Sequence, residues 1–218
     1  MIRISQLRRI FNYFFRFFID KIKLSNLNRK WRENNLENST SLINKNSPID
    51  RINVGKGTYG ALDVRFFGAE NEKLVIGAYC SIARGVIFVM GGNHRYDTIS
   101  TYPFKVRMFH LQPEEAISKG SIIIEDDVWM GTNAIILSGV KIGQGAIIGA
   151  GTVVSNDIPP YSIAVGNPLR IIKKRFPDDI ISKLLKIDIK SIEWESIPID
   201  RLYKSISSTK DIDDILFK

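Results

Sequence analysis

One histidine in the chain is placed where proton transfer could be used for chemistry. His94 lies in the stretch GGNHRYDTISTYPF, Gly91 to Phe104, and is one of only two histidines. A hydroxyl is a poor nucleophile until its proton has somewhere to go, and an imidazole can accept that proton at neutral pH. His94 is therefore a candidate general base, and an ordinary hydrogen-bonding loop residue is the alternative. His110, in RMFHLQPEE, has no comparable surroundings and is interpreted as a loop residue.

A six-residue repeat surrounds this stretch and predicts the scaffold that positions it. From Ile124 the sequence divides into IEDDVW, MGTNAI, ILSGVK, IGQGAI, IGAGTV and VSNDIP, and the frame appears earlier as VGKGTY, IGAYCS and IARGVI. Neither a helix nor an alternating strand produces this period. Each unit is predicted to be one short strand and a corner of a prism, with its first position pointing inward and its coil stacked on the next.

Glycines follow the inward position in several units of the repeat. We expect them to supply the unusual backbone dihedrals that a corner requires. The residues concerned are Gly55, Gly77, Gly131, Gly143 and Gly149.

The six-residue frame is interrupted between FVMGGN and SIIIEDD. Residues 95–121 follow no six-residue rule, so this part of the chain must leave the prism as a loop, and the insertion is taken as 91–121. Long loops in compact domains are more often functional than idle. The repeat therefore predicts that His94 stands at the root of a functional loop.

The motifs resemble those of the xenobiotic acetyltransferase family, which includes chloramphenicol and streptogramin acetyltransferases and many saccharide O-acetyltransferases. The run DDVWMGTNAIILSGVKIGQGAIIGAGTVVSNDIPPYSIAVGNP is similar to the coenzyme-binding end of these proteins, and Asn-His-Arg, Asp and Ser-Thr-Tyr-Pro-Phe to their active-site loop. The resemblance implies a mainly β fold, a left-handed parallel β-helix, here assigned to residues 51–175.

The same resemblance implies a reaction and a catalytic residue. The loop histidine, here His94, would be the base for direct transfer of an acetyl group from acetyl-CoA to a hydroxyl, without an acyl-enzyme. Arg95, Tyr96 and Asp97 would orient the loop or the acceptor, or form hydrogen bonds within the loop.

A path for coenzyme A is also implied by the resemblance. Thr132 in WMGT and Ala150 in IGAG would contact the pantetheine arm mainly through backbone groups. Ser155 and Asn156 in VVSND occupy the place of the family's usual Thr-Lys pair, so the lysine that could meet a phosphate is absent.

Two basic residues in NPLRIIKKRF match positions that meet the phosphates of the nucleotide in the family. They are Arg170 and Lys173, and positive charge is reasonable there, although solvated surface charge is the alternative. Proteins of this family form homotrimers with active sites between neighbours, and a three-sided prism suits such packing.

The positive charge of the chain is concentrated at its N-terminus. The net charge is +8, and residues 1–32 hold nine Lys or Arg against Asp20 alone, while the remainder balances at 22 against 22. A protein that binds nucleic acid over its whole surface is therefore disfavoured, and a basic N-terminal arm is favoured.

This N-terminal arm has the spacing of an amphipathic helix. Arg9, Asn12, Arg16, Asp20 and Lys23 fall opposite an apolar stripe made of Ile4, Leu7, Phe11, Phe14, Phe15, Phe18 and Ile22. Polar residues interrupt every window long enough to span a membrane, and no cleavage site of small residues indicates a signal peptide.

Two locations remain open for the helix of residues 1–23. It lies on an anionic membrane surface, which we favour, or it packs on the body of the protein. Residues 24–48 are rich in Asn and Ser and are expected to form a polar connector with little structure. Residues 1–50 would thus be a helix and connector preceding the prism.

The remaining features are a single cysteine and the C-terminal segment. Cys80 excludes an internal disulfide framework, fits a reducing compartment and is expected to be a buried structural thiol. The run FPDDIISKLLKI, with Pro177 near its start, predicts a helix, and residues 176–218 are assigned to a C-terminal helix and tail.

Taken together, these features favour an acetyl-CoA-dependent O-acetyltransferase that modifies a sugar hydroxyl of a cell-surface polysaccharide or of its lipid-linked precursor. The location would be cytoplasmic, peripheral on the inner face of the membrane if the helix binds lipid. The first alternative is a xenobiotic acetyltransferase. A zinc enzyme is disfavoured, because two histidines and one cysteine do not meet the need for about three ligands, and no metal is expected. A non-catalytic scaffold is the last alternative.

Overall fold

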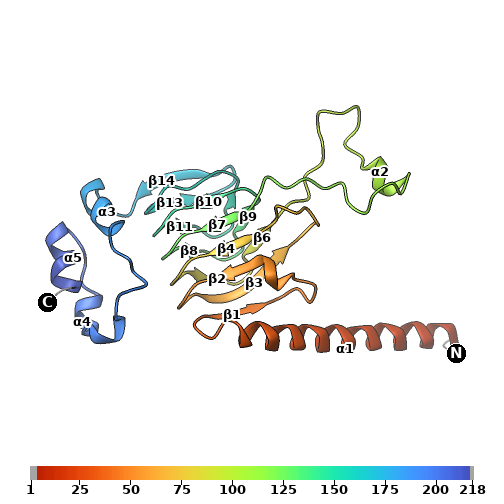
Figure 1. The fold of residues 1–218 in the computed structure, drawn as a ribbon, viewed down its shortest axis with the longest axis horizontal. Helices are drawn as coiled ribbons and strands as arrows, with labels where there is room; N and C mark the ends of the chain where they lie inside the picture. The colour runs from red at the N-terminus through yellow and green to blue at the C-terminus, as the bar shows by residue number, and fades with distance from the viewer. Residues whose placement is uncertain (1–3, 217–218) are drawn as a thin grey trace.

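Short strands stack into a three-sided prism that has a long helix across its base and small helices along one edge (Figure 1). This computed structural model describes residues 4–216, apart from the side chains of residues 4, 5 and 7–10. The strands form three sides, which we call faces A, B and C, and the chain visits them in the order B, A, C in each coil.

Each face is a ladder of parallel strands, and face A alone among the described strands ends in an antiparallel one. Face A holds β1 (Ser39–Leu42), the start of β3 (Tyr59–Arg65), β5 (Ser81–Ile82), β8 (Trp129–Met130), β11 (Ile147–Ile148), β13 (Ser162–Val165) and the antiparallel β14 (Arg170–Lys174). Face B holds β2 (Ile52–Val54), β4 (Leu74–Ile76), β7 (Ile122–Ile124) and β10 (Lys141–Ile142). Face C holds the end of β3, β6 (Ile87–Val89), β9 (Ile135–Leu137) and β12 (Val153–Val154).

The inward position of the repeat forms the core, as predicted. Ile124 pairs with Ile76 below it and Ile142 above it, so equivalent positions stack from coil to coil. Stacking of this kind removes apolar surface from water without any one coil having a core of its own. The first and fifth positions are all buried: Ile124, Val128, Met130, Ala134, Ile136, Val140, Ile142, Ala146, Ile148, Thr152, Val154 and Ile158.

The glycines that follow the inward positions have a different role from the predicted one. None of them has a positive φ, so the expectation of unusual dihedrals is wrong. They are required by close approach: a Cβ on Gly131 would lie 2.6 Å from the backbone N of Ala150, and one on Gly143 would lie 2.5 Å from the N of Pro160. The left-handed corner conformation falls two residues later, for example at Gly145 and at Asn133.

The insertion leaves the prism at the edge between faces C and B, as the break in the repeat predicts. Its root is closed by an antiparallel bridge between Asn93 and Ile117, and the Ser118 hydroxyl donates to the Met90 carbonyl at 2.5 Å. The loop carries the short helix α2 (Phe104–Arg107) and projects from the side of the stack (Figure 1). The frame then resumes at β7.

The N-terminal helix is longer than predicted, and the expected connector is structured. Helix α1 spans Ile4–Glu33, so it takes up the first part of the expected connector, residues 24–48. Strand β1 lies in the same range, and the 3-10 turn η1 (Ile49–Arg51) follows it. Trp31 is 2% exposed and its Nε1 donates to the Thr40 hydroxyl at 3.1 Å. Asn28 accepts from the Leu42 N–H at 2.7 Å. The polar side chains that suggested a connector thus bind backbone groups, while Trp31 closes the open end of the first coil.

The expectation that α1 would form an amphipathic helix fits the residues whose side chains are described. Ile4, Leu7 and Arg9 lie in the helix, but their side chains fall outside the described part. Across residues 4–216, no helix is both long enough and apolar enough to cross a membrane.

The C-terminal segment covers the edge between faces B and A. Helix α3 (Asp178–Leu184) is the predicted helix, and η2 (Trp194–Ser196), α4 (Ile199–Leu202) and α5 (Thr209–Leu216) follow it without having been predicted. Trp194 packs edge-on against Tyr79, with ring centroids 5.9 Å apart, and the Lys190 ammonium lies 3.2 Å from Asp126. Two of the three prism edges therefore remain for a site.

Candidate active site

His94 is held at the root of the loop by one short hydrogen bond. Its Nδ1 lies 2.6 Å from the carbonyl oxygen of Thr101. A carbonyl oxygen can only accept, so Nδ1 carries the proton and Nε2 is left with a free lone pair. The side chain is exposed and lines a cavity of about 850 Å³ formed by the loop together with Phe67 and Gly92. This is the geometry of an available base next to a space for a substrate.

The Ser-Thr-Tyr-Pro-Phe run supports the histidine through its backbone. Thr101 supplies the carbonyl, the Ser100 hydroxyl accepts from the Tyr102 N–H at 3.1 Å, and the rings of Tyr102 and Phe104 pack with centroids 4.9 Å apart. The role of Thr101 was missed in the sequence, because a backbone acceptor leaves no signal in residue type.

Arg95 and Asp97 bind each other. The guanidinium donates to the two carboxylate oxygens at 3.0 and 2.7 Å, which lowers the pKa of Asp97 and raises that of Arg95. Both are exposed, and such pairs stabilise little. Tyr96 is exposed beside them. Within residues 4–216 none of the three makes a recorded hydrogen bond to the His94 ring, and a contact of these residues with an acceptor stays a prediction.

A buried carboxylate beneath the loop root was not predicted. Glu72 is 1% exposed and accepts from the N–H of Phe67 at 2.9 Å and of Gly68 at 3.2 Å. It borders Gly91, and the Phe67 ring covers Gly92 so closely that a Cβ there would lie 2.8 Å from Cε1. Glu72 therefore fixes the turn on which the residues before His94 rest. In the sequence it looks like one acid of a surface turn.

Replacing Glu72 by Ala is expected to loosen the loop. Two N–H groups would lose their acceptor at about 1–3 kcal/mol each where they stay dry, so the loop should open more often. We expect trypsin to cleave after Arg95, Lys105 and Arg107 roughly tenfold faster, by mass spectrometry, since cleavage follows the open fraction. Glu72→Gln should recover part of the protection, and Glu70→Ala, at an exposed acid of the same turn, should change nothing. Unaltered cleavage in Glu72→Ala contradicts this role.

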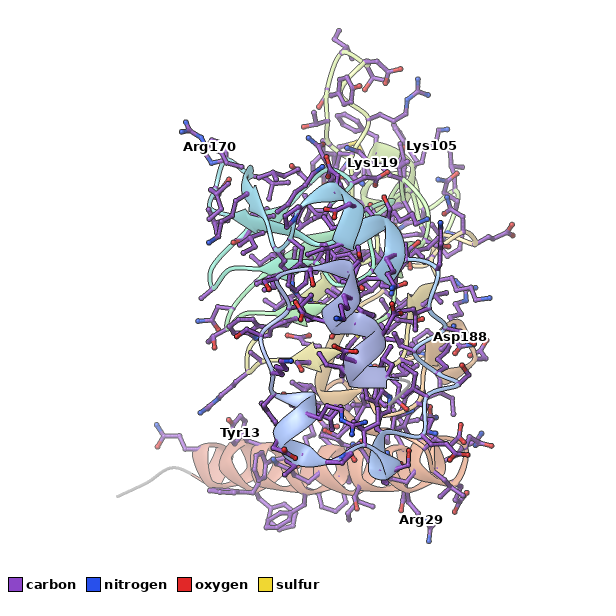
Figure 2. All side chains as sticks on the ribbon, turned by 90° about the vertical axis from the view of Figure 1, so that its left-hand side faces the viewer. Tyr13, Arg29, Lys105, Lys119, Arg170 and Asp188 are labelled. Atoms are coloured by element: carbon purple, nitrogen blue, oxygen red, sulfur yellow. The ribbon has the colours of Figure 1, made fainter. Side chains whose placement is uncertain are left out.

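Three of the predicted coenzyme residues form a row along the edge between faces A and C. Thr132 and Ala150 occupy the same corner in successive coils, where the Gly151 N–H donates to the Thr132 carbonyl at 2.8 Å. Arg170 pairs with Val165 at the next level, and Figure 2 shows its side chain extending into solvent. Among the described residues, no protein acceptor is recorded for the N–H of Thr132 or Ala150, so these groups are available to a ligand.

The other predicted coenzyme residues lie elsewhere. Ser155 and Asn156 follow β12 at the edge between faces C and B, two coils above the loop root, in the turn whose Asp157 accepts from the Lys141 N–H at 2.7 Å. Lys173 pairs with Ile163 further back along β14, and its side chain is exposed. Face C therefore separates Ser155, Asn156 and His94 from the row.

One chain alone thus does not bring the candidate base and the row of predicted coenzyme residues together. His94 belongs to the edge between C and B, whereas Thr132 and Ala150 belong to the edge between A and C. The residues present offer donors and positive charge that suit a nucleotide-bearing thioester. Across residues 4–216, no group of three or more His, Cys, Asp and Glu is arranged to hold a metal ion.

The stacked coils correspond to a known class of transferases. Residues 121–156 match the family model described as bacterial transferase hexapeptide (six repeats). The chain is 48% identical over 123 residues to a probable macrolide acetyltransferase of Lysinibacillus sphaericus, covering 54% of this chain and 68% of that protein. It therefore belongs to the hexapeptide-repeat acetyltransferases, and its prism is their left-handed parallel β-helix.

Two further proteins are similar to part of the chain. A chloramphenicol acetyltransferase of Klebsiella aerogenes is 45% identical over 141 residues, with 60% of this chain and 63% of that protein covered. The matched region is thus less than two thirds of the length of that relative. A crystal structure of a hexapeptide-repeat acetyltransferase from Vibrio cholerae has 25% identity, covers 63% of this chain and 70% of that chain, and gives a TM-score of 0.48.

Proposed function

We propose that the protein transfers an acetyl group from acetyl-CoA directly to a hydroxyl, with His94 as the general base. The observation that carries this proposal is the bond from Nδ1 to the Thr101 carbonyl, which in the neutral imidazole leaves the lone pair on Nε2, in a side chain that lines the loop cavity. Nε2 takes the hydroxyl proton as the oxygen bonds to the thioester carbonyl carbon. The tetrahedral intermediate then breaks its C–S bond, and the leaving sulfur receives that proton.

The single cysteine supports direct transfer. Cys80 is fully buried inside a coil, and burial raises the pKa of its thiol to about 12. A thiol in that state is protonated at neutral pH and is a poor nucleophile. An acyl-enzyme on Cys80 is therefore not part of the proposed reaction.

We propose that acetyl-CoA lies along the row of Thr132, Ala150 and Arg170, with Lys173 near its phosphates. Because face C separates this row from His94, a second chain is needed to complete the site. A homotrimer in which the edge between A and C of one chain meets the edge between C and B of its neighbour would supply both halves. Ser155 and Asn156 would then enter the site from the neighbour together with His94.

For the acceptor, the names of the relatives favour a small hydroxyl-bearing antibiotic, such as chloramphenicol or a macrolide. The second candidate is a sugar hydroxyl of a cell-surface polysaccharide or its lipid-linked precursor, at the inner face of the membrane. The exposed aromatic residues of α1 favour it, because a freely diffusing antibiotic does not require them.

The test is acetyl transfer by the full-length protein. Release of coenzyme A thiol is followed with acetyl-CoA and, in separate reactions, chloramphenicol, a streptogramin, a macrolide and oligosaccharides from surface glycans. We expect release that depends on one acceptor, and a product heavier by one acetyl group. Absence of acetyl-CoA binding in calorimetry would contradict the proposal and favour a non-catalytic scaffold.

A further inference from the structure

Helix α1 presents an apolar stripe to solvent. Five large side chains on one face are each 55% to 69% exposed: Phe11, Phe14, Phe15, Phe18 and Ile22. Single exposed apolar residues are normal on a protein surface, but a continuous stripe of this kind marks an interaction site. We call these five residues the aromatic stripe.

The body of the protein uses a different face of the same helix. Leu24, Leu27 and Trp31 turn toward the prism, and at about 100° per residue their mean direction is roughly 160° from that of the aromatic stripe. Arg29, seven residues after Ile22, shares the face of the stripe, and in Figure 2 it points away from the prism. The chain therefore cannot cover its own stripe, and packing on the body is excluded for this face.

The net charge of α1 decides between the remaining occupants of the stripe. From Phe11 to Glu33 the helix carries six basic residues, Arg16, Lys21, Lys23, Arg29, Lys30 and Arg32, against Asp20 and Glu33. Asp20 is already paired with Lys45. A second copy stacked base to base would set these cations against their equivalents, which is unfavourable, whereas anionic lipid headgroups complement them.

We propose that the aromatic stripe docks on an anionic bilayer surface, with α1 lying flat in the interface and the prism standing on it. The helix crosses the base of the stack (Figure 1). The stripe lies on the side of α1 opposite the residues that pack on the prism, so the coils do not obstruct the contact. The loop leaves after the second coil, which holds His94 above the surface. In the trimer proposed above, with prisms side by side, three stripes would share one plane and add their affinities.

The test is flotation of the full-length protein with vesicles of phosphatidylcholine alone and of phosphatidylcholine with about 30% phosphatidylglycerol. We expect binding to the anionic vesicles and weak binding to the neutral ones. The variant Phe14→Ser/Phe18→Ser should lower the partition coefficient at least about tenfold, because two interfacial rings are lost.

A matched variant distinguishes docking through the aromatic stripe from nonspecific hydrophobic binding. Tyr13→Ser/Phe17→Ser removes two rings from the side of α1 nearer the prism and should lower partitioning less than about twofold. Equal losses in both variants, or no binding of the unchanged protein to anionic vesicles, would overturn the proposal. A third result would also overturn it. If light scattering without lipid shows that the Phe14→Ser/Phe18→Ser variant has half the mass of the unchanged protein, a second copy of the chain covers the stripe. Flotation needs no acetyl transfer, so membrane docking can be refuted while the proposed acetyl transfer holds. Acetyl transfer can likewise be refuted while docking holds.

Discussion

Replacing His94 by Ala is expected to lower kcat for acetyl transfer by about 10²–10⁴-fold, the usual contribution of a general base. The acceptor hydroxyl would keep its proton while attacking, and nothing else recorded at the loop root offers a free lone pair on a ring nitrogen. KM for acetyl-CoA should change little, because the proposed contacts to the coenzyme come from Thr132, Ala150 and Arg170 of the neighbouring chain and not from His94. Steady-state rates of thiol release give both numbers.

The second histidine provides the control for this prediction. His110 is exposed in the same loop, so His110→Ala changes the same residue type without touching the proposed base. Both variants should melt within a few degrees of the parent, because exposed side chains contribute little to stability. A His94→Ala protein that keeps more than about a tenth of the activity would remove His94 from the role of base.

Trp31→Ala is expected to destabilise the protein by about 3–5 kcal/mol, the range for truncating a large buried aromatic side chain. The indole fills the open end of the first coil among Leu42 and Leu62, and its loss would also leave the Thr40 hydroxyl without the indole N–H as a donor. Urea unfolding followed by circular dichroism measures the change.

A nearby substitution tests whether the loss of stability is specific to Trp31 or follows from any truncation in this segment. Leu36 is 80% exposed just after α1, and Leu36→Ala should change the free energy of unfolding by less than about 0.5 kcal/mol. Trp31→Phe, which keeps a ring but not the N–H, should lie between the parent and the alanine variant. Equal stability of Trp31→Ala and the parent would show that the first coil needs no cover.

The prism could be predicted because its physical cause is local and repeated. Every coil buries the same position against the same position in the next coil, so Ile124 and Ile142 carry the signal in their spacing. The break at Gly91 follows from the same frame. The glycines were found in the right places for the wrong reason, since close approach between coils is visible only in space.

The rest depends on contacts between segments that are distant in the sequence. Trp31 lies in a polar stretch, and only the open end of the first coil explains its burial. Glu72 gains its role from Phe67 and the root of the loop, not from its neighbours in the sequence. The split of the predicted coenzyme residues between two edges also needed the topology, because Ala150 and Ser155, only five residues apart, lie on either side of β12 and so at opposite edges of face C.

The burial of Cys80 makes the protein convenient for spectroscopy. Its thiol is enclosed in a coil and stays protonated far above neutral pH, so maleimides should leave it unmodified under mild conditions. A cysteine introduced at Tyr96, an exposed position two residues after His94, would be the one reactive thiol of the chain. A fluorophore attached there would report closure of the loop over an acceptor in real time, without removal of the native cysteine.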